Sequence, residues 1–164
     1  MKKSRKNKLI LLFLFILFNV GLDQLSKSIV REKIDYNQNI ALIDGYLTLT
    51  KVENTGAFLS IGDELPEALR VTLLNLLPIL VLAFGFYYLY TQDDLPTPIQ
   101  IGMCCLLGGG IGNIYDRIKF GSVTDFLHID LGFVSTGVFN VADLSIMTGI
   151  GILLLQSFKR KIVA

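Results

Sequence analysis

Four long apolar stretches, separated by polar segments, constrain this chain more than any other feature of its sequence. They cover about 9–30, 67–90, 98–118 and 138–158. Each is near the roughly 20 residues that a helix needs to cross the hydrocarbon core of a membrane. The composition agrees, because only 18% of the residues are charged, whereas a soluble domain has about 25%. We therefore predict an all-α polytopic membrane protein with four transmembrane helices, built as one membrane domain over residues 1–164.

Basic residues cluster next to apolar stretches at both ends of the chain. The first cluster runs from Lys2 to Lys8, and the second from Lys159 to Lys161. The positive-inside rule places such clusters in the cytoplasm. A basic head before an apolar stretch is also typical of a signal peptide, but no small-residue cleavage site follows here. We predict a retained first span and two cytoplasmic termini, in agreement with an even number of spans.

The longest polar region, about 35–64, carries turn and strand signals. Asp44-Gly45 is a turn signal, and the segment from Tyr46 to Val52 alternates polar and apolar residues, which favours a strand. Asn54-Thr55-Gly56 is a second turn signal. We expect a small antiparallel patch outside the membrane, too short to be an independent domain. A further strand is expected at 123–131, in the loop before the last span.

Two carboxylates lie at the edges of the last two apolar stretches. Asp116 follows Asn113 by three residues and Asp143 follows Asn140 by three, so each pair shares one helix face. Under the predicted topology both acids lie at the outer interface, where neighbouring helices would bring them together. Two carboxylates within hydrogen-bond reach share a proton, so one can activate a water while the other polarises a carbonyl. This pattern favours peptide hydrolysis without a metal or a cofactor.

Simpler interpretations of the same residues stay open. Asp116 and Arg117 could form an ion pair at a helix end, and Asp143 could be only a partner of its helix dipole. Asp23 and Lys27 are spaced i, i+4 and could pair with each other on one helix face. Rival functions are a small proton- or ion-coupled membrane carrier, with the acids as its relay, and a non-catalytic scaffold. A carrier would need polar residues leading inward, and the third stretch has none deep in the membrane.

Other local features favour structural roles. The glycines between 108 and 112 remove side-chain bulk and let another backbone approach closely. The adjacent Cys104 and Cys105 fit small buried hydrophobic residues, and Pro78 predicts a kink in the second span. His128 is the only histidine, and we interpret it as a loop residue.

Five short motifs occur in order along the chain. They are Asp-Gln-Leu-Ser-Lys at 23–27, Glu-Asn-Thr-Gly-Ala-Phe at 53–58, Gly-x-Gly-Asn-x-x-Asp-Arg at 110–117, Val-Thr-Asp-Phe at 123–126 and Phe-Asn-Val-Ala-Asp at 139–143. Each motif is weak by itself. Through their order and their placement on four spans, the chain resembles the bacterial lipoprotein signal peptidase (signal peptidase II) family over nearly its whole length.

The resemblance implies an aspartic endopeptidase of the bacterial cytoplasmic (inner) membrane, with its active site near the extracytoplasmic face. Such enzymes remove the signal peptide from prolipoproteins by cutting before a cysteine that carries diacylglycerol. The implied partners are diacylglyceryl-prolipoproteins and membrane lipid, not nucleic acid, and the implied state is a monomer. The polar patch would correspond to the family's extracytoplasmic β-cradle.

The same resemblance implies roles for individual residues, with Asp116 and Asp143 as the catalytic pair. The residues implied to line or support the site are Asn54, Asn113, Arg117, Asn140 and Ala142, together with Asp23, Lys27, Gly56 and Asp125. The chain departs from the family pattern at Phe58, where alanine is frequent, and at Thr124, where an aliphatic residue is common. Both departures could adjust the fit of the substrate.

Overall fold

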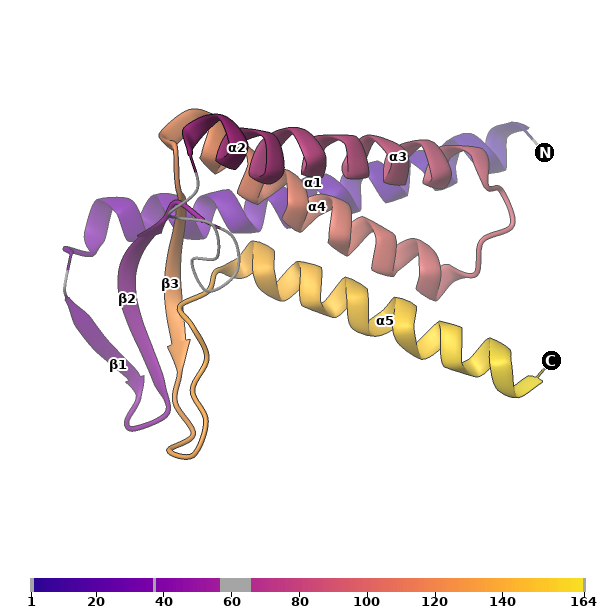
Figure 1. The fold of residues 1–164 in the computed structure, drawn as a ribbon. Coiled ribbons are helices and arrows are strands. Elements are labelled where there is room, and N and C mark those ends of the chain that lie inside the picture. The colour runs from indigo at the N-terminus through magenta and orange to yellow at the C-terminus, as the bar shows by residue number, and fades with distance from the viewer. Residues whose placement is uncertain (1, 37, 57–65, 164) are drawn as a thin grey trace.

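The computed structural model describes residues 2–36, 38–56 and 66–163. Its helices pack side by side, with a small sheet at one end and both termini at the other (Figure 1). The helical elements are α1 (Lys2–Lys33), α2 (Glu67–Val71), the π-helical turn η2 (Thr72–Leu76), α3 (Leu77–Thr91), α4 (Thr97–Phe120) and α5 (Val141–Val163). The strands are β1 (Asn39–Ile43), β2 (Leu47–Asn54) and β3 (Val123–Ile129).

Three helical segments, Arg5–Lys33, Ala68–Thr91 and Val141–Lys159, are long and apolar enough to cross a membrane. Large apolar side chains cover their outer faces: Phe13 is 55% exposed and Phe84 67% exposed. Soluble monomers rarely expose contiguous apolar surface of this kind. The helices and the small sheet therefore fit a membrane protein. Helix α4 differs because it packs against α1, α3 and α5, and its glycines and polar residues lower its hydropathy.

Glycines on α4 allow its neighbours to approach from more than one side. A Cβ placed on Gly108 would lie 2.6 Å from the Cβ of Asn19 on α1. A Cβ on Gly109 would overlap the backbone oxygen of Ala142, in the first turn of α5. Because a methyl group at either position would push a helix away, only glycine permits this spacing. The predicted close approach at these glycines is confirmed.

The sheet is antiparallel in the order β1-β2-β3. A turn containing Gly45, at φ +73°, joins β1 to β2, and β3 pairs with β2 from Leu47↔Ile129 to Asn54↔Val123. The predicted patch and the strand near 123–131 are thus present, but they form one sheet, which we did not predict. His128, interpreted as a residue of the loop before the last span, lies in β3 opposite Thr48, within the strand expected at 123–131. Residues 37 and 57–65 of the patch, including Phe58, lie outside the described residues.

Two helix details differ from the sequence-based boundaries. The second apolar stretch is interrupted by η2, which ends two residues before Pro78; a π-helical turn is one way in which a membrane helix accommodates the backbone donor that a proline lacks. Helix α5 begins at Val141 instead of 138, because the backbone N–H of Phe139 donates to the oxygen of Leu127 at 2.8 Å. Cys104 and Cys105 are free and buried, as predicted.

Candidate functional site

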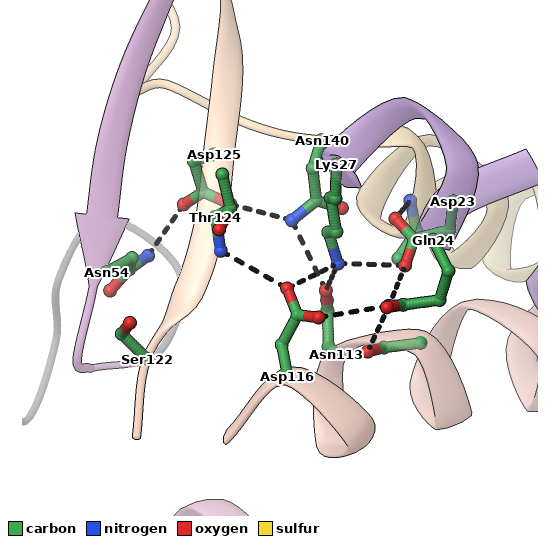
Figure 2. A network of polar contacts seen from close by, with 12 residues as sticks. Asp23, Gln24, Lys27, Asn54, Asn113, Asp116, Ser122, Thr124, Asp125 and Asn140 are labelled. Atoms are coloured by element: carbon green, nitrogen blue, oxygen red, sulfur yellow. Dashed lines mark hydrogen bonds and ion pairs between the residues drawn. The ribbon is translucent and has the colours of Figure 1, made fainter. Parts of the chain in front are cut away.

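A buried polar cluster lies where the sheet meets the helices, and Figure 2 shows its contacts. Helices α1 and α4, the strands β2 and β3, and the start of α5 all contribute side chains. Every site residue predicted from the sequence lies in this cluster or directly contacts it. The members that are less than a tenth exposed include Asp23, Lys27, Asn54, Asn113, Asp116, Asp125 and Asn140.

Lys27 is the central cation of the cluster and is fully buried. Its Nζ lies 2.9 Å from Asp23 Oδ2, 2.8 Å from Asn113 Oδ1 and 3.4 Å from Asp116 Oδ2. The predicted i, i+4 pairing with Asp23 is therefore confirmed. A buried lysine needs such compensation, because the cost of removing an isolated charge from water amounts to several kcal/mol.

Asp23 joins α1 to the helix that carries Asp143. Its Oδ1 accepts a hydrogen bond from the backbone N–H of Ala142 at 2.9 Å. This carboxylate thus satisfies one of the free amide groups in the first turn of α5, where a negative charge is also favoured by the helix dipole. Gly112 leaves room for the Asp23 carboxylate beside α4.

Asp116 is held between two cations. Its Oδ2 lies 2.6 Å from Arg31 Nη2 and 3.4 Å from Lys27 Nζ, and it also accepts the backbone N–H of Thr124 at 3.3 Å. Its Oδ1 accepts a hydrogen bond from Gln24 at 3.0 Å. The side chain is fully buried. These contacts occupy both of its oxygens.

Asp143 is only half-buried, and two asparagines orient it. Asn113 Nδ2 donates to Asp143 Oδ1 at 2.9 Å, and the backbone N–H of Asn140 donates to Oδ2 at 3.1 Å. In return, the backbone N–H of Asp143 donates to Asn140 Oδ1 at 3.0 Å. The three-residue spacing seen in the sequence therefore produces a reciprocal cap at the start of α5.

Asp125 projects from β3 into the same cluster and is 3% exposed. Asn54 Nδ2 donates to its Oδ2 at 2.9 Å, and Asn140 Nδ2 donates to its Oδ1 at 2.6 Å. Burial raises the pKa of Asp125 from 3.8 to about 6; the two amide donors oppose this shift, and the nearby charge of Asp143 adds to it.

Arg117 fixes the turn after β2. Its Nη2 donates to the backbone oxygen of Gly56 at 2.7 Å. The backbone N–H of Gly56 in turn donates to Asn54 Oδ1 at 3.0 Å, so the predicted turn signal forms an Asx-type turn. The Arg117 guanidinium also lies within electrostatic reach of Asp125, Asp143 and Asp116.

The acids are not equally close to one another in this network. Two intermediates, Lys27 and Asn113, separate Asp116 from Asp143. A single residue, Asn140, contacts both Asp125 and Asp143. The convergence expected of Asp116 and Asp143 is thus indirect, and Asp125 interacts more directly with Asp143.

Two residues of the cluster were missed from the sequence. Gln24 donates to Asp23, to Asp116 and to the backbone oxygen of Gly112, and Arg31 pairs with Asp116. A signal for Arg31 was available, because Asp23, Lys27 and Arg31 recur every four residues on one helix face.

An apolar groove of about 420 Å³ opens beside Asp143. Ile129, Phe139, Leu144 and Met147 line it, together with residues 135–137. Of Asp116, Asp125 and Asp143, only Asp143 borders this groove. Among the residues that the structure describes, no group of three or more His, Cys, Asp or Glu side chains is placed to hold a metal ion.

The raised pKa of Asp125 predicts a pH-dependent loss of stability. Between pH 3.8 and about 6 the folded protein keeps a proton that the unfolded chain releases, so this group's contribution decreases as the pH rises through that window. We expect the free energy of unfolding of the wild type, relative to Asp125→Asn, to fall by about 2.4 kcal/mol from pH 4 to pH 7.

This prediction can be measured by unfolding in mixed detergent micelles, followed by circular dichroism. Asp44→Asn is a suitable control, because Asp44 is an exposed acid between β1 and β2. The difference in the free energy of unfolding between Asp44→Asn and the wild type should not change with pH. A flat profile for Asp125→Asn as well would contradict a raised pKa at this position.

Comparison with known proteins identifies clear relatives. A family model described as signal peptidase II matches residues 15–159. The lipoprotein signal peptidase of Aquifex aeolicus is 38% identical over 117 residues, which cover 71% of this chain and 68% of that protein. The lipoprotein signal peptidase of Streptococcus pyogenes serotype M1 is 33% identical over 156 residues, which cover 95% and 97% of the two chains.

Solved structures agree with these matches. A bacterial membrane enzyme superimposes with a TM-score of 0.82 at 25% identity, covering 92% of this chain and 88% of the other. A second bacterial membrane enzyme superimposes with a TM-score of 0.78 at 24% identity and shares the fold, covering 90% and 92% of the two chains.

Proposed function

The chain belongs to the signal peptidase II family, and from this premise we propose that Asp125 and Asp143 are the acid pair that hydrolyses the substrate. The protein is an aspartic endopeptidase that removes signal peptides from prolipoproteins. Membership in this family does not support the alternative of an ion-coupled carrier. The observation that carries the proposed pair is the contact of Asn140 with both acids.

The proposed pair differs from the pair expected from the sequence, Asp116 with Asp143. A proton-sharing pair needs one carboxyl group that can hold a proton near neutral pH. Both carboxylate oxygens of Asp116 are occupied by other protein groups, among them Lys27, Arg31 and Gln24. Among the described residues, the side chains that donate hydrogen bonds to Asp125 are the neutral amides of Asn54 and Asn140, and burial raises its pKa to about 6. We therefore assign Asp116 a structural role, as the anion that binds Lys27 and Arg31.

The geometry also supports separate roles within the pair. Asp143 borders the groove, so we assign it to accept a proton from the attacking water. Asp125, with its raised pKa, gives its proton to the carbonyl oxygen of the scissile bond. When the tetrahedral intermediate collapses, the C–N bond breaks, Asp143 gives its proton to the departing amine, and the hydroxyl formed from the carbonyl oxygen returns its proton to Asp125, as in other aspartic proteases.

The remaining polar residues position this pair. Asn113 and Asn140 orient Asp143, while Asn54 and Asn140 orient Asp125. Asp23 holds the backbone of Ala142 at the start of α5. Lys27 compensates the buried acids, and Arg117 holds the turn at Gly56.

We also propose the placement of the protein in the membrane. Helices α1, α2–α3, α4 and α5 form four spans of a single domain, with α4 enclosed by the others. Both termini, which lie at the end opposite the sheet (Figure 1), face the cytoplasm, because basic residues cluster there. The sheet and the acid pair then lie at the extracytoplasmic face of the bacterial cytoplasmic membrane. The protein acts as a monomer in contact with membrane lipid.

The groove beside Asp143 supports a lipid-bearing substrate. Its apolar lining suits the hydrocarbon next to the cleavage point, so we propose that the enzyme cuts before a cysteine that carries diacylglycerol. A synthetic diacylglyceryl prolipoprotein peptide should be cleaved roughly 100-fold faster than the same peptide without lipid. That factor requires about 3 kcal/mol, which about four buried methylene groups supply.

The assay compares both peptides in detergent micelles, with the products identified by mass spectrometry. Asp143→Asn is the control for contaminating proteases. Equal cleavage of the two peptides would contradict the lipid requirement. If neither peptide is cleaved by folded protein, the proposed function itself is contradicted.

A further inference from the structure

A second polar set lies on the face of the sheet opposite Asp125. Successive side chains on a strand point to opposite faces, so Thr124 points away from its neighbour Asp125. Thr124 is paired across the sheet with Glu53 on β2. Arg31 of α1 reaches the same face. Thr124, Glu53, Arg31 and Ser122 are called the Thr124 clasp below.

The contacts of the clasp form a continuous chain. Arg31 Nε donates to Thr124 Oγ1 at 2.8 Å, and the Thr124 hydroxyl donates to Glu53 Oε1 at 3.0 Å. Ser122 Oγ donates to Glu53 Oε2 at 2.7 Å. Thr124 is fully buried. Its hydroxyl therefore depends on protein partners, and it accepts one hydrogen bond from Arg31 and donates one to Glu53.

The clasp is connected to the structural anion Asp116 at two points. The Arg31 guanidinium that contacts Thr124 also pairs with Asp116 at 2.6 Å. The backbone N–H of Thr124 donates to the same oxygen of Asp116. The guanidinium carbon of Arg31 lies over the ring of Phe120, 4.0 Å from the ring centroid. Residue 124 is therefore held through its side chain and its backbone by groups on α1, α4 and β2.

We propose that Thr124 is a positioning residue. Its hydroxyl bridges Arg31 and Glu53, and this bridge holds β3 in the position where Asp125 forms its hydrogen bond with Asn140. The inference rests on the proposed function, because it takes Asp125 as one of the two catalytic acids. The next peptide unit along β3 carries Asp125, so a shift of Thr124 moves that carboxyl group. Asn140 Nδ2 and Asp125 Oδ1 are only 2.6 Å apart, and this contact tolerates little movement.

An apolar side chain at position 124 would fill the same space but would form no hydrogen bonds that fix the position of β3. Valine has nearly the shape of threonine but can neither accept from Arg31 nor donate to Glu53. Both partners would keep a second contact, since Arg31 retains Asp116 and Glu53 retains Ser122. Thr124→Val should therefore fold, while β3 loses its hydrogen-bonded connection to α1 through this side chain.

The test measures kcat and KM for a diacylglyceryl prolipoprotein peptide with Thr124→Val and Thr124→Ser. Misplacement of a catalytic group lowers turnover, so Thr124→Val should reduce kcat by roughly 10-fold or more, with KM close to the wild-type value. Thr124→Ser keeps the hydroxyl and should retain most of the activity. Thr48→Val is the matched control: it makes the same change on β2, at a residue that pairs with His128.

Each outcome of this test supports or overturns the positioning role of Thr124. A wild-type kcat in Thr124→Val, or an equal loss in Thr124→Ser, would overturn the positioning role of the hydroxyl. If Thr124→Val does not accumulate as folded protein, Glu53→Ala removes the same connection from β2, and unchanged turnover in that variant overturns the proposal. Failure of the proposed pair is distinguished separately, because it would appear as turnover by Asp125→Asn, whatever the Thr124 variants do.

Discussion

Asp125→Asn and Asp143→Asn are each expected to abolish cleavage of a lipidated precursor, with the rate falling by roughly 10³-fold or more. Asparagine keeps the size of the side chain but cannot exchange a proton with water or with the substrate's carbonyl oxygen. Asp116→Asn should instead leave measurable turnover in the folded fraction, because Asp116 acts through Lys27 and Arg31. Its main effect should be a lower stability.

The comparison requires rates per folded molecule. Protein extracted in detergent is separated by size-exclusion chromatography before the assay, and helix content is checked by circular dichroism. The observation that would exclude Asp125 from the pair is near-normal turnover by folded Asp125→Asn. Complete inactivity of well-folded Asp116→Asn, together with activity in Asp125→Asn, would restore the pair expected from the sequence.

Lys27→Met is expected to lower the free energy of unfolding by about 3–5 kcal/mol. Methionine fills a similar volume, but Asp23 and Asp116 would then lose their shared buried cation. Asn113 would also lose one of the two donors at its Oδ1, the Lys27 Nζ at 2.8 Å, and with it part of the support for Asp143. Unfolding in mixed micelles, followed by circular dichroism, measures the loss.

Two further variants make this result specific. Lys33→Met removes a lysine that pairs with Glu32 at the surface, so its effect should stay within about 0.5 kcal/mol. The double variant Lys27→Met with Asp23→Asn should recover part of the stability, because one uncompensated acid is removed. Lys27→Met as stable as Lys33→Met would show that the buried lysine does not compensate these acids.

The polar motifs could be recognised from the sequence because their spacing is local. The i, i+4 spacing of Asp23 and Lys27 puts both side chains on one face of α1, and they form the expected pair. Asn140 and Asp143 lie three residues apart and cap the start of α5 together. These contacts depend on helix geometry, which repeats regardless of the rest of the fold.

The catalytic partner of Asp143, in contrast, could not be identified from local spacing. Asp116 matched Asp143 in its spacing from an asparagine and in its place at the edge of an apolar stretch. Asp125 lay in a loop with a strand signal, and its role was expected to be only supporting. Only the packed structure brings Asn140 to Asp125 at 2.6 Å and Arg31 to Asp116 at 2.6 Å.

The sequence by itself determined the apolar helices, the antiparallel patch and the polar motifs, because these depend on hydropathy, periodicity and local spacing. Only the tertiary structure decided that β3 pairs with the patch, that the Asp116 carboxylate forms ion pairs with Lys27 and Arg31, and that Asp125 lies beside Asn140. Those features depend on contacts between segments far apart in the chain, as the pairs Arg31–Thr124 and Asn54–Asp125 illustrate. No local pattern in the sequence records which of these distant side chains meet.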